Sequence, residues 1–170
     1  RLIASLWDGK DGSIELGGVD IRTLPLAECT KRIAYVSQDN FLFDTTVMEN
    51  IRMGKQNATD AEVMEAAKAC GCHAFILGLE NGYDTVCTPE IFSQGQWQLL
   101  SIARAAVAEP SILLLDEITA NLDVETEKEV LQALRRVSEN RGKICRGWKK
   151  NLILNSGNGL KTLQKTRGPL

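Results

Sequence analysis

Two acidic residues, Asp116 and Glu117, directly follow an aliphatic run at 112–115. Four bulky aliphatic residues in a row are typical of a strand that is covered on both faces of a parallel sheet. The carboxyl end of such a strand is the edge at which open α/β sheets bind ligands. Because two adjacent carboxylates are costly to bury, they must meet water, a cation or a proton there. The pair forms either an acidic turn or a reactive site, in which Asp116 holds Mg²⁺ and Glu117 polarises an attacking water, as phosphoryl transfer requires.

A second candidate site lies at 93–96, directly before a run of apolar residues with helical spacing. Ser93 and Gln96 have the spacing of a capping box, in which each side chain bonds the backbone N–H of the other residue. Gly95 leaves the first turn without a side chain, and bare amides at the positive end of a helix bind anions. Because capping uses only some of these donors, the segment either caps a helix alone or also binds a phosphate.

Hydrophobic periodicity and caps predict the elements that must position these residues. Thr59 and Glu62 form another capping box, and Gly71 ends the helix that this box begins. The pattern predicts a hairpin around 17–18, strands at 33–36 and 112–116, and helices at 1–7, 25–31, 60–70, 73–79, 93–108 and 124–138. Strands that alternate with helices indicate an α/β fold with a parallel sheet.

Composition limits the class of protein. The chain has 170 residues, 44% of them hydrophobic and 25% charged, which is typical of one globular domain. No apolar run approaches the ~20 residues of a membrane span, so we expect no transmembrane segment in this chain. Five cysteines, an odd number without framework spacing, indicate free thiols in a reducing compartment. A metal site at 70–73 (C-G-C-H) is disfavoured, because His73 is the only histidine.

The charge is unevenly distributed along the chain. All 22 acidic residues precede residue 140, whereas residues 140–170 contain eight of the 20 basic residues and no acidic one. Such a change in composition marks a boundary. A basic tail either contacts nucleic acid or anionic lipid, or is solvated and disordered. We expect the second, and we expect no nucleic-acid partner.

Taken together, these stretches resemble the nucleotide-binding domain of ABC transporters, and residues 41–51 resemble its exporter-type members. Four motifs stand in the order of that family. They are YVSQD at 35–39 (the Q-loop), FSQGQ at 92–96 (the LSGGQ signature), ILLLDE at 112–117 (the Walker B strand) and ANLD at 120–123 (the D-loop). The resemblance covers about residues 1–140 and implies a P-loop NTPase-like α/β fold, with a parallel sheet core and a helical subdomain at about 47–108.

The resemblance also implies ATP and Mg²⁺ as cofactors and assigns a role to each matching residue. The implied roles are catalytic for Glu117 and Gln38, metal-binding for Asp116 and Gln38, and nucleotide-binding for Ser93, Gly95, Gln96 and Asp123. Members of the family pair two such domains head to tail, so that the signature of one contacts the γ-phosphate of ATP held by the other. Residues 38–51 would face the coupling helices of a membrane domain, which implies a peripheral position at the cytoplasmic face of a membrane.

Two departures from the family qualify these roles. None of the Gly-Lys pairs belongs to the phosphate-binding motif G-x-x-x-x-G-K-[ST], and residues 142–170 contain no histidine that could serve as the family's switch histidine. We expect residues 1–141 to be a partial domain, truncated before residue 1, and residues 142–170 to be a disordered or out-of-frame tail. The isolated chain is then expected to be inactive. The alternatives are a non-catalytic fragment or interaction module, and a soluble ATPase of the ABC superfamily.

Overall fold

The computed structural model describes residues 15–16, 19–37, 41–88, 90–116, 118–119, 122–139, 144–147 and 151–155. The strands are β1 (Glu15–Leu16), β2 (Val19–Asp20), β3 (Ile33–Val36), β4 (Ile112–Asp116), β5 (Ile144–Gly147) and β6 (Asn151–Asn155). The helices are α1 (Leu26–Arg32), α2 (Val47–Arg52), α3 (Asp60–Ala69), α4 (His73–Leu77), α5 (Gln94–Val107) and α6 (Val124–Glu139), with 3₁₀ turns at Ile21–Thr23 and Gly82–Asp84.

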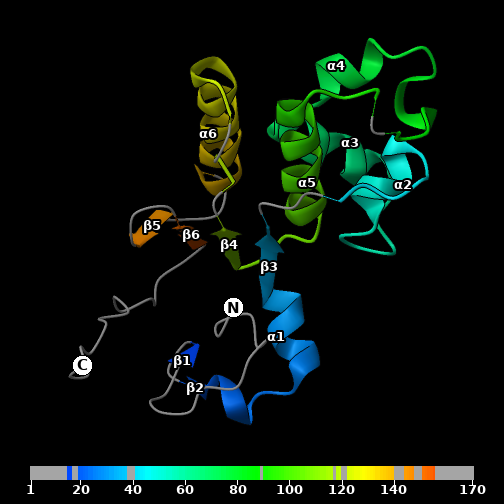
Figure 1. Ribbon diagram of the computed structural model, residues 1–170. Coiled ribbons are helices and arrows are strands. Elements are labelled where there is room, and N and C mark those ends of the chain that lie inside the picture. Colours follow the sequence, from blue (N-terminus) through cyan, green and yellow to red (C-terminus); the bar gives the residue numbers. More distant parts are fainter. Residues whose placement is uncertain are drawn as a thin grey trace.

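A four-stranded sheet lies at the centre of the described chain, in the order β3-β4-β6-β5. Figure 1 shows α2–α5 grouped beyond one end of β3 and β4, α6 beside α5, and α1 with the β1–β2 ribbon towards the other end. β3 and β4 are parallel, with Val36 opposite Leu115, as the sequence predicts. β6 runs antiparallel to both β4 and β5, so the whole sheet is mixed.

Residues 144–147 and 151–155 lie in the tail that is expected to be disordered or out of frame, and they form strands β5 and β6. The central residues of β6 are Leu152, Ile153 and Leu154. This apolar run is short and stands in a basic segment, so the composition of the segment does not indicate a strand. Pairing with β4 also satisfies backbone N–H and C=O groups that an open strand edge would leave without partners. The boundary near residue 141 stays a prediction.

The predicted hairpin, the strands at 33–36 and 112–116 and the helices within 25–138 are confirmed to within a few residues. Both capping boxes are present, at Thr59 with Glu62 and at Ser93 with Gln96. Gly71 follows α3 with a φ of 77°, a left-handed conformation that suits glycine. The helix expected at 1–7 lies outside the described residues. Within the described part, no helix is both long enough and apolar enough to cross a bilayer.

Helix α2 is not among the helices that the sequence predicts. It is six residues long, and the side chain of its N-cap residue Thr46 accepts a hydrogen bond from the backbone N–H of Glu49. The T-x-x-E pattern at 46–49 was a signal for this helix start. The helix is too short to show the repeated spacing of apolar residues along one face. Hydrophobic periodicity therefore does not predict it.

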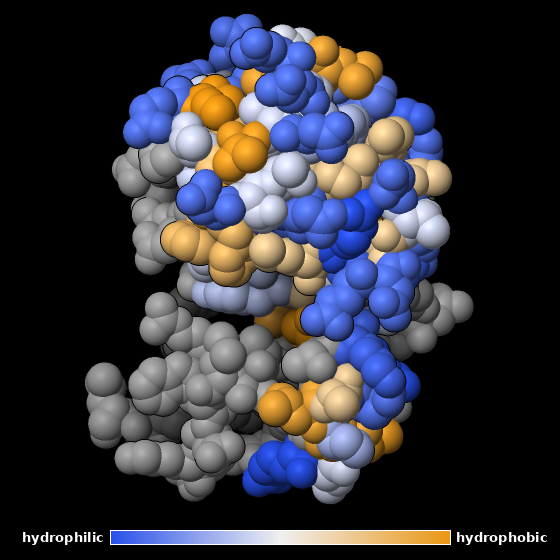
Figure 2. All heavy atoms as spheres, turned by 90° about the vertical axis from the view of Figure 1, so that its right-hand side faces the viewer, coloured by the Kyte–Doolittle hydropathy of each residue, from blue (hydrophilic) through white to orange (hydrophobic). Residues whose placement is uncertain are grey.

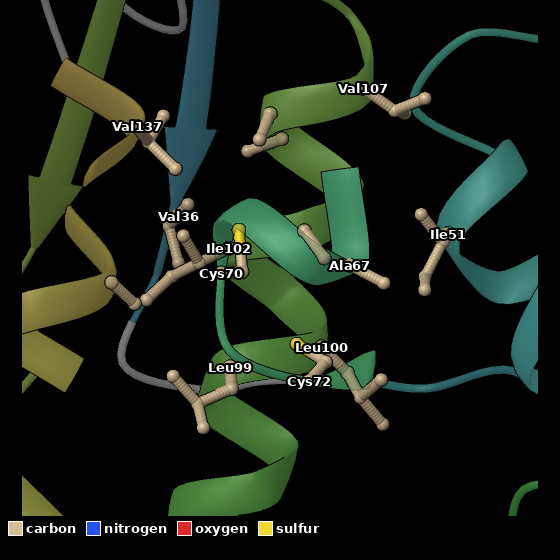
Figure 3. Packing of buried hydrophobic residues seen from close by; sticks show 14 of the residues in the cluster. Val36, Ile51, Ala67, Cys70, Cys72, Leu99, Leu100, Ile102, Val107 and Val137 are labelled. Atoms are coloured by element: carbon tan, nitrogen blue, oxygen red, sulfur yellow. The ribbon is translucent and has the colours of Figure 1, made fainter. Parts of the chain in front are cut away.

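Helix α5 forms the centre of the core. Ten of its 14 residues are buried, and it packs against α2, α3, α6 and β3. Figure 3 shows Leu99, Leu100 and Ile102 of α5 between residues from neighbouring elements. Ile102 is fully buried, as are Ile51 of α2 and Leu134 of α6. Because α5 starts at the predicted signature segment, this packing determines where that segment lies.

Candidate functional site at the start of α5

Part of the predicted site lies outside the described side chains. Gln38 and Glu117 are not among the described residues, and Asp116 is described only as the last residue of β4. The parallel register of β3 and β4 nevertheless places the ends of both strands at one edge of the sheet. This is the edge at which the sequence predicts a ligand. The predicted roles of these three residues stay predictions.

The signature segment forms the N-terminus of α5. Ser93 Oγ accepts the backbone N–H of Gln96 at 3.3 Å, and Gln96 Oε1 accepts the backbone N–H of Ser93 at 3.0 Å. Ser93 is exposed and Gln96 is half-buried. The cap therefore uses the amides of Ser93 and Gln96, whereas those of Gln94 and Gly95 belong to the first turn, which has no helical acceptor. Neutral amide donors at a positive helix end suit an anion such as a phosphate.

Gly95 is buried because α6 lies directly against it. A Cβ atom added at Gly95 would lie 2.2 Å from Cγ2 of Thr126, far closer than two carbon atoms approach. The sequence alone suggests a different reason for glycine here, namely free access to the first-turn amides. The structure adds that no larger residue fits between α5 and α6 without a shift.

Asp123 caps α6 and bonds the same threonine. Asp123 Oδ1 accepts the backbone N–H groups of Glu125 and Thr126, each at 3.0 Å, and Oδ2 accepts the Thr126 hydroxyl at 2.6 Å. These bonds, the hydroxyl first among them, hold the pKa of Asp123 below its ordinary value. Gly95 and Asp123, two of the predicted nucleotide-binding residues, thus share Thr126 as a neighbour, which the sequence did not reveal.

A buried polar network connects α5 to the segment before α2, and sequence reasoning missed it. Asn50 is fully buried; its Oδ1 accepts the Phe43 backbone N–H at 2.8 Å, and its Nδ2 donates to the carbonyls of Phe43, Thr45 and Thr46. Arg104 of α5 donates to the backbone carbonyl of Asn50 at 2.8 Å and to its Oδ1 at 2.9 Å. A buried amide satisfied on both sides fixes the loop around it.

Arg104 also extends beyond Asn50 to the aromatic residues at 41–43. It donates to the Phe41 carbonyl at 2.8 Å, and its guanidinium carbon lies 5.4 Å from the centre of the Phe43 ring. Burial lowers the pKa of Arg104 from its ordinary value, but an arginine remains charged at neutral pH. The sequence shows Arg104 only as an interruption of an apolar helix, and such an interruption was the available signal for a buried partner.

An open groove lies between β3 and α5 beside these aromatic residues. Its volume is about 360 Å³, and its lining includes Tyr35, Phe41, Phe43, Ser101 and Arg104. The Phe41 and Phe43 side chains are exposed, and their rings meet edge to face with centroids 4.9 Å apart. Figure 2 views the molecule from the side of α2 and α4, and the coloured part of its surface mixes hydrophilic residues with separate hydrophobic ones. Ser101 also lines the groove, and its buried Oγ has no hydrogen-bond partner among the described atoms.

The C-G-C-H segment at 70–73 contributes two thiols to the core and one imidazole to a hydrogen bond. Cys70 and Cys72 are buried thiols, and His73 Nδ1 is 2.9 Å from the hydroxyl of Tyr83. Burial raises the pKa of Cys72 well above its ordinary value, so this thiol stays protonated. Among the described residues, no group of three or more His, Cys, Asp or Glu side chains could hold a metal ion.

Comparisons with known proteins agree with the fold. The family model described as ABC transporter matches residues 1–120. The chain is 46% identical over 155 residues to the uncharacterized ABC transporter ATP-binding protein YfiC of Bacillus subtilis, covering 90% of the chain and 26% of that protein. It is 44% identical over 142 residues to ABC transporter B family member 13 of Arabidopsis thaliana, covering 82% and 11% respectively.

The structure of a bacterial Atm1-family ABC exporter with ATP bound is similar to this one, with a TM-score of 0.72 and 37% sequence identity. The match covers 81% of the present chain and 24% of the exporter chain. The fold is therefore that of an ABC-type ATPase of the P-loop NTPase class, present here as part of the domain. The chain belongs to the ABC transporter family, and its similarity to exporters confirms the resemblance inferred from the motifs. It spans about a quarter of the length of its bacterial relatives.

Proposed function

We propose that this chain acts as part of an ATP-binding domain that drives export across a membrane. The observation that carries the proposal is the signature segment, where first-turn amides of α5 lie next to the capped start of α6. Neutral donors at a helix N-terminus are suited to a γ-phosphate that another domain presents. The 37% identity to an exporter with ATP bound supports the same function.

Domains of this family bind ATP with Mg²⁺, and the residues of this chain divide into two sets for that purpose. We assign Ser93, Gly95 and Gln96 to the binding of the γ-phosphate of an ATP molecule that a partner domain holds. We assign Asp123 to a contact across the interface between the two domains. The first-turn amides and the Ser93 hydroxyl fit an anion because they are donors without a negative charge. ATP supplies the phosphoryl group, and its hydrolysis provides the free energy for transport.

The second set follows the ends of β3 and β4. We assign Asp116 and Gln38 to the binding of Mg²⁺. Glu117 removes a proton from the attacking water, and Gln38 also contacts that water. The common edge of the two parallel strands supports this assignment, because it brings their carboxyl ends together. Carboxylate and amide oxygens are the protein ligands that Mg²⁺ prefers.

The proposed partners are a second ATP-binding domain, arranged head to tail, and a membrane domain that contacts residues 38–51. The exposed rings of Phe41 and Phe43 and the adjacent groove support the second contact, since an apolar surface of this kind suits a docked helix. In this arrangement, the domain lies at the cytoplasmic face of the membrane, with α2–α5 as its helical subdomain.

Association that depends on Mg-ATP tests the proposal. The chain is mixed with a relative's ATP-binding domain that carries the P-loop motif, and complex formation is measured by analytical ultracentrifugation with and without Mg-ATP. We expect a complex only with Mg-ATP, because the nucleotide is shared between the two chains. A complex that forms equally with and without Mg-ATP favours the alternative function, an interaction module. The absence of the G-x-x-x-x-G-K-[ST] motif from the sequence supports that alternative. No complex in either condition contradicts the proposal.

Variants at Gln96 sharpen this experiment. Glutamate serves in a capping box as well as glutamine does, so Gln96→Glu keeps the helix start and adds a negative charge beside the proposed phosphate. We expect association to weaken at least about tenfold, with an unchanged urea midpoint. The matched control is Gln132→Glu on the exposed face of α6, which adds the same charge away from the site. Equal association of both variants and the wild type would exclude Gln96 from the phosphate site.

A further inference from the structure

Thr126 lies between two residues that the proposed function uses. Its methyl carbon Cγ2 occupies the space where a Gly95 side chain would begin, 2.2 Å from the site of a Cβ atom, with Cβ and Oγ1 of Thr126 at 3.5 and 3.7 Å from that site. Its hydroxyl donates to Asp123 Oδ2 at 2.6 Å. One short side chain therefore contacts both the start of α5 and the cap of α6.

The orientation of the Thr126 side chain is fixed. Its backbone N–H and its hydroxyl bond different oxygens of Asp123, and a β-branched residue has few accessible χ1 rotamers in a helix. A rotation about χ1 that moved the methyl group away from Gly95 would break the hydroxyl bond. The methyl group is consequently held against Gly95 for as long as Asp123 accepts that bond.

We propose that Thr126 is a positioning residue for the signature segment 93–96. The inference rests on the proposed function and deepens it, because it connects two residues assigned to the dimer interface within one chain. Asp123 sets the orientation of Thr126, and Thr126 sets the approach of α6 to Gly95. A partner domain that displaces Asp123 therefore also displaces the first turn of α5, where the phosphate donors lie.

A double-mutant cycle in the full chain tests the contact itself. An alanine in a helix is ordinarily more stable than a glycine, so a loss of stability in Gly95→Ala is diagnostic of the contact. We expect a lower urea midpoint and about tenfold faster exchange of the Gln96 and Trp97 amides, as overpacking predicts. Thr126→Ser removes Cγ2 and keeps the hydroxyl, so the double variant should regain both properties.

The matched control is Gly78→Ala. Gly78 has a right-handed backbone, and a Cβ atom there would meet ordinary contacts of 3.4 Å or more, so this variant should not lose stability. If Thr126→Ser fails to rescue Gly95→Ala, the methyl group does not occupy the space beside Gly95 and the proposal is wrong.

Mg-ATP-dependent association tests the positioning role. Thr126→Val keeps the shape and the methyl group but loses the bond to Asp123, and we expect association to weaken about fivefold, the effect of one hydrogen bond. Thr126→Ser, which keeps that bond, should associate more tightly than Thr126→Val. Equal association of the wild type and Thr126→Val overturns the positioning role alone. Absence of association in the wild type overturns the proposed function, and the double-mutant cycle still reports on the contact.

Discussion

Arg104 donates to Asn50 twice, at the backbone carbonyl and at the side-chain oxygen, although the two residues are 54 positions apart. Asn50 in turn bonds three carbonyls of the segment before α2. These hydrogen bonds connect helix α5, which begins at the signature segment, to the aromatic residues at 41–43. We expect these two parts to move together, so that a displacement at one end of α5 reaches the surface proposed to contact a membrane domain.

Asn50→Ala tests how strongly this network holds the fold. The variant leaves the Phe43 N–H, three carbonyls and an Arg104 donor without their partner in a buried place. We expect a loss of about 3 kcal/mol in the free energy of unfolding, measured by urea denaturation. Asn81→Ala is the control, because Asn81 is exposed and its side chain makes no capping bond. Equal stabilities of the two variants would show that the network contributes little.

Gly54→Ala tests the packing of the loop after α2 against α5. A Cβ atom at Gly54 would lie 1.8 Å from the backbone oxygen of Arg104 and 2.9 Å from Cγ1 of Val107. Because helix backbone cannot rotate away, we expect a loss of about 2–3 kcal/mol, also by urea denaturation. Gly78→Ala again provides the comparison. A Gly54→Ala variant as stable as the wild type would mean that the loop and α5 are further apart.

Acid should weaken the start of α3 through Glu62. The ion pair with Lys55, and then the bonds from the backbone and hydroxyl of Thr59, lower the pKa of Glu62 from 4.5 to about 2. A carboxyl group whose pKa is lower in the folded state stabilises the fold above its unfolded pKa, and this contribution is lost as the pH falls towards about 2. Glu62→Gln keeps the capping geometry and removes the titrating group.

The urea midpoints of the wild type and Glu62→Gln, measured from pH 7 to pH 2, isolate this contribution from those of the other carboxyl groups. We expect the wild type to be the more stable protein at pH 7, and the difference to shrink below about pH 4.5. A difference that is constant with pH would show that Glu62 has no lowered pKa in the folded chain.

Buried thiols should resist alkylation in the folded chain. Cys70, Cys72 and Cys87 are buried, and desolvation raises the pKa of Cys87 to about 11. Because only the thiolate reacts, we expect these three cysteines to be unlabelled by iodoacetamide at pH 8 and fully labelled in urea, as measured by site-resolved mass spectrometry. Rapid native labelling of Cys72 would contradict the packing shown in Figure 3.

Local patterns determined much of this protein without any structure. The T-x-x-E and S-x-x-Q pairs at 59–62 and 93–96 identified two helix starts, and the aliphatic run at 112–115 identified a parallel strand. These signals depend on neighbours within about four positions, which is the range of capping bonds and helical periodicity. The order of the motifs was enough to recognise the family.

Tertiary structure decided the contacts between distant segments. The bonds of Arg104 to Asn50, the fit of Thr126 against Gly95 and the strands at 144–147 and 151–155 depend on which surfaces meet. No local pattern encodes such pairs, because the stability of each contact comes from burial and close packing that exist only after α5 has been enclosed. The sequence therefore determined what kind of protein this is, whereas the enclosure of α5 determined how its signature segment is held.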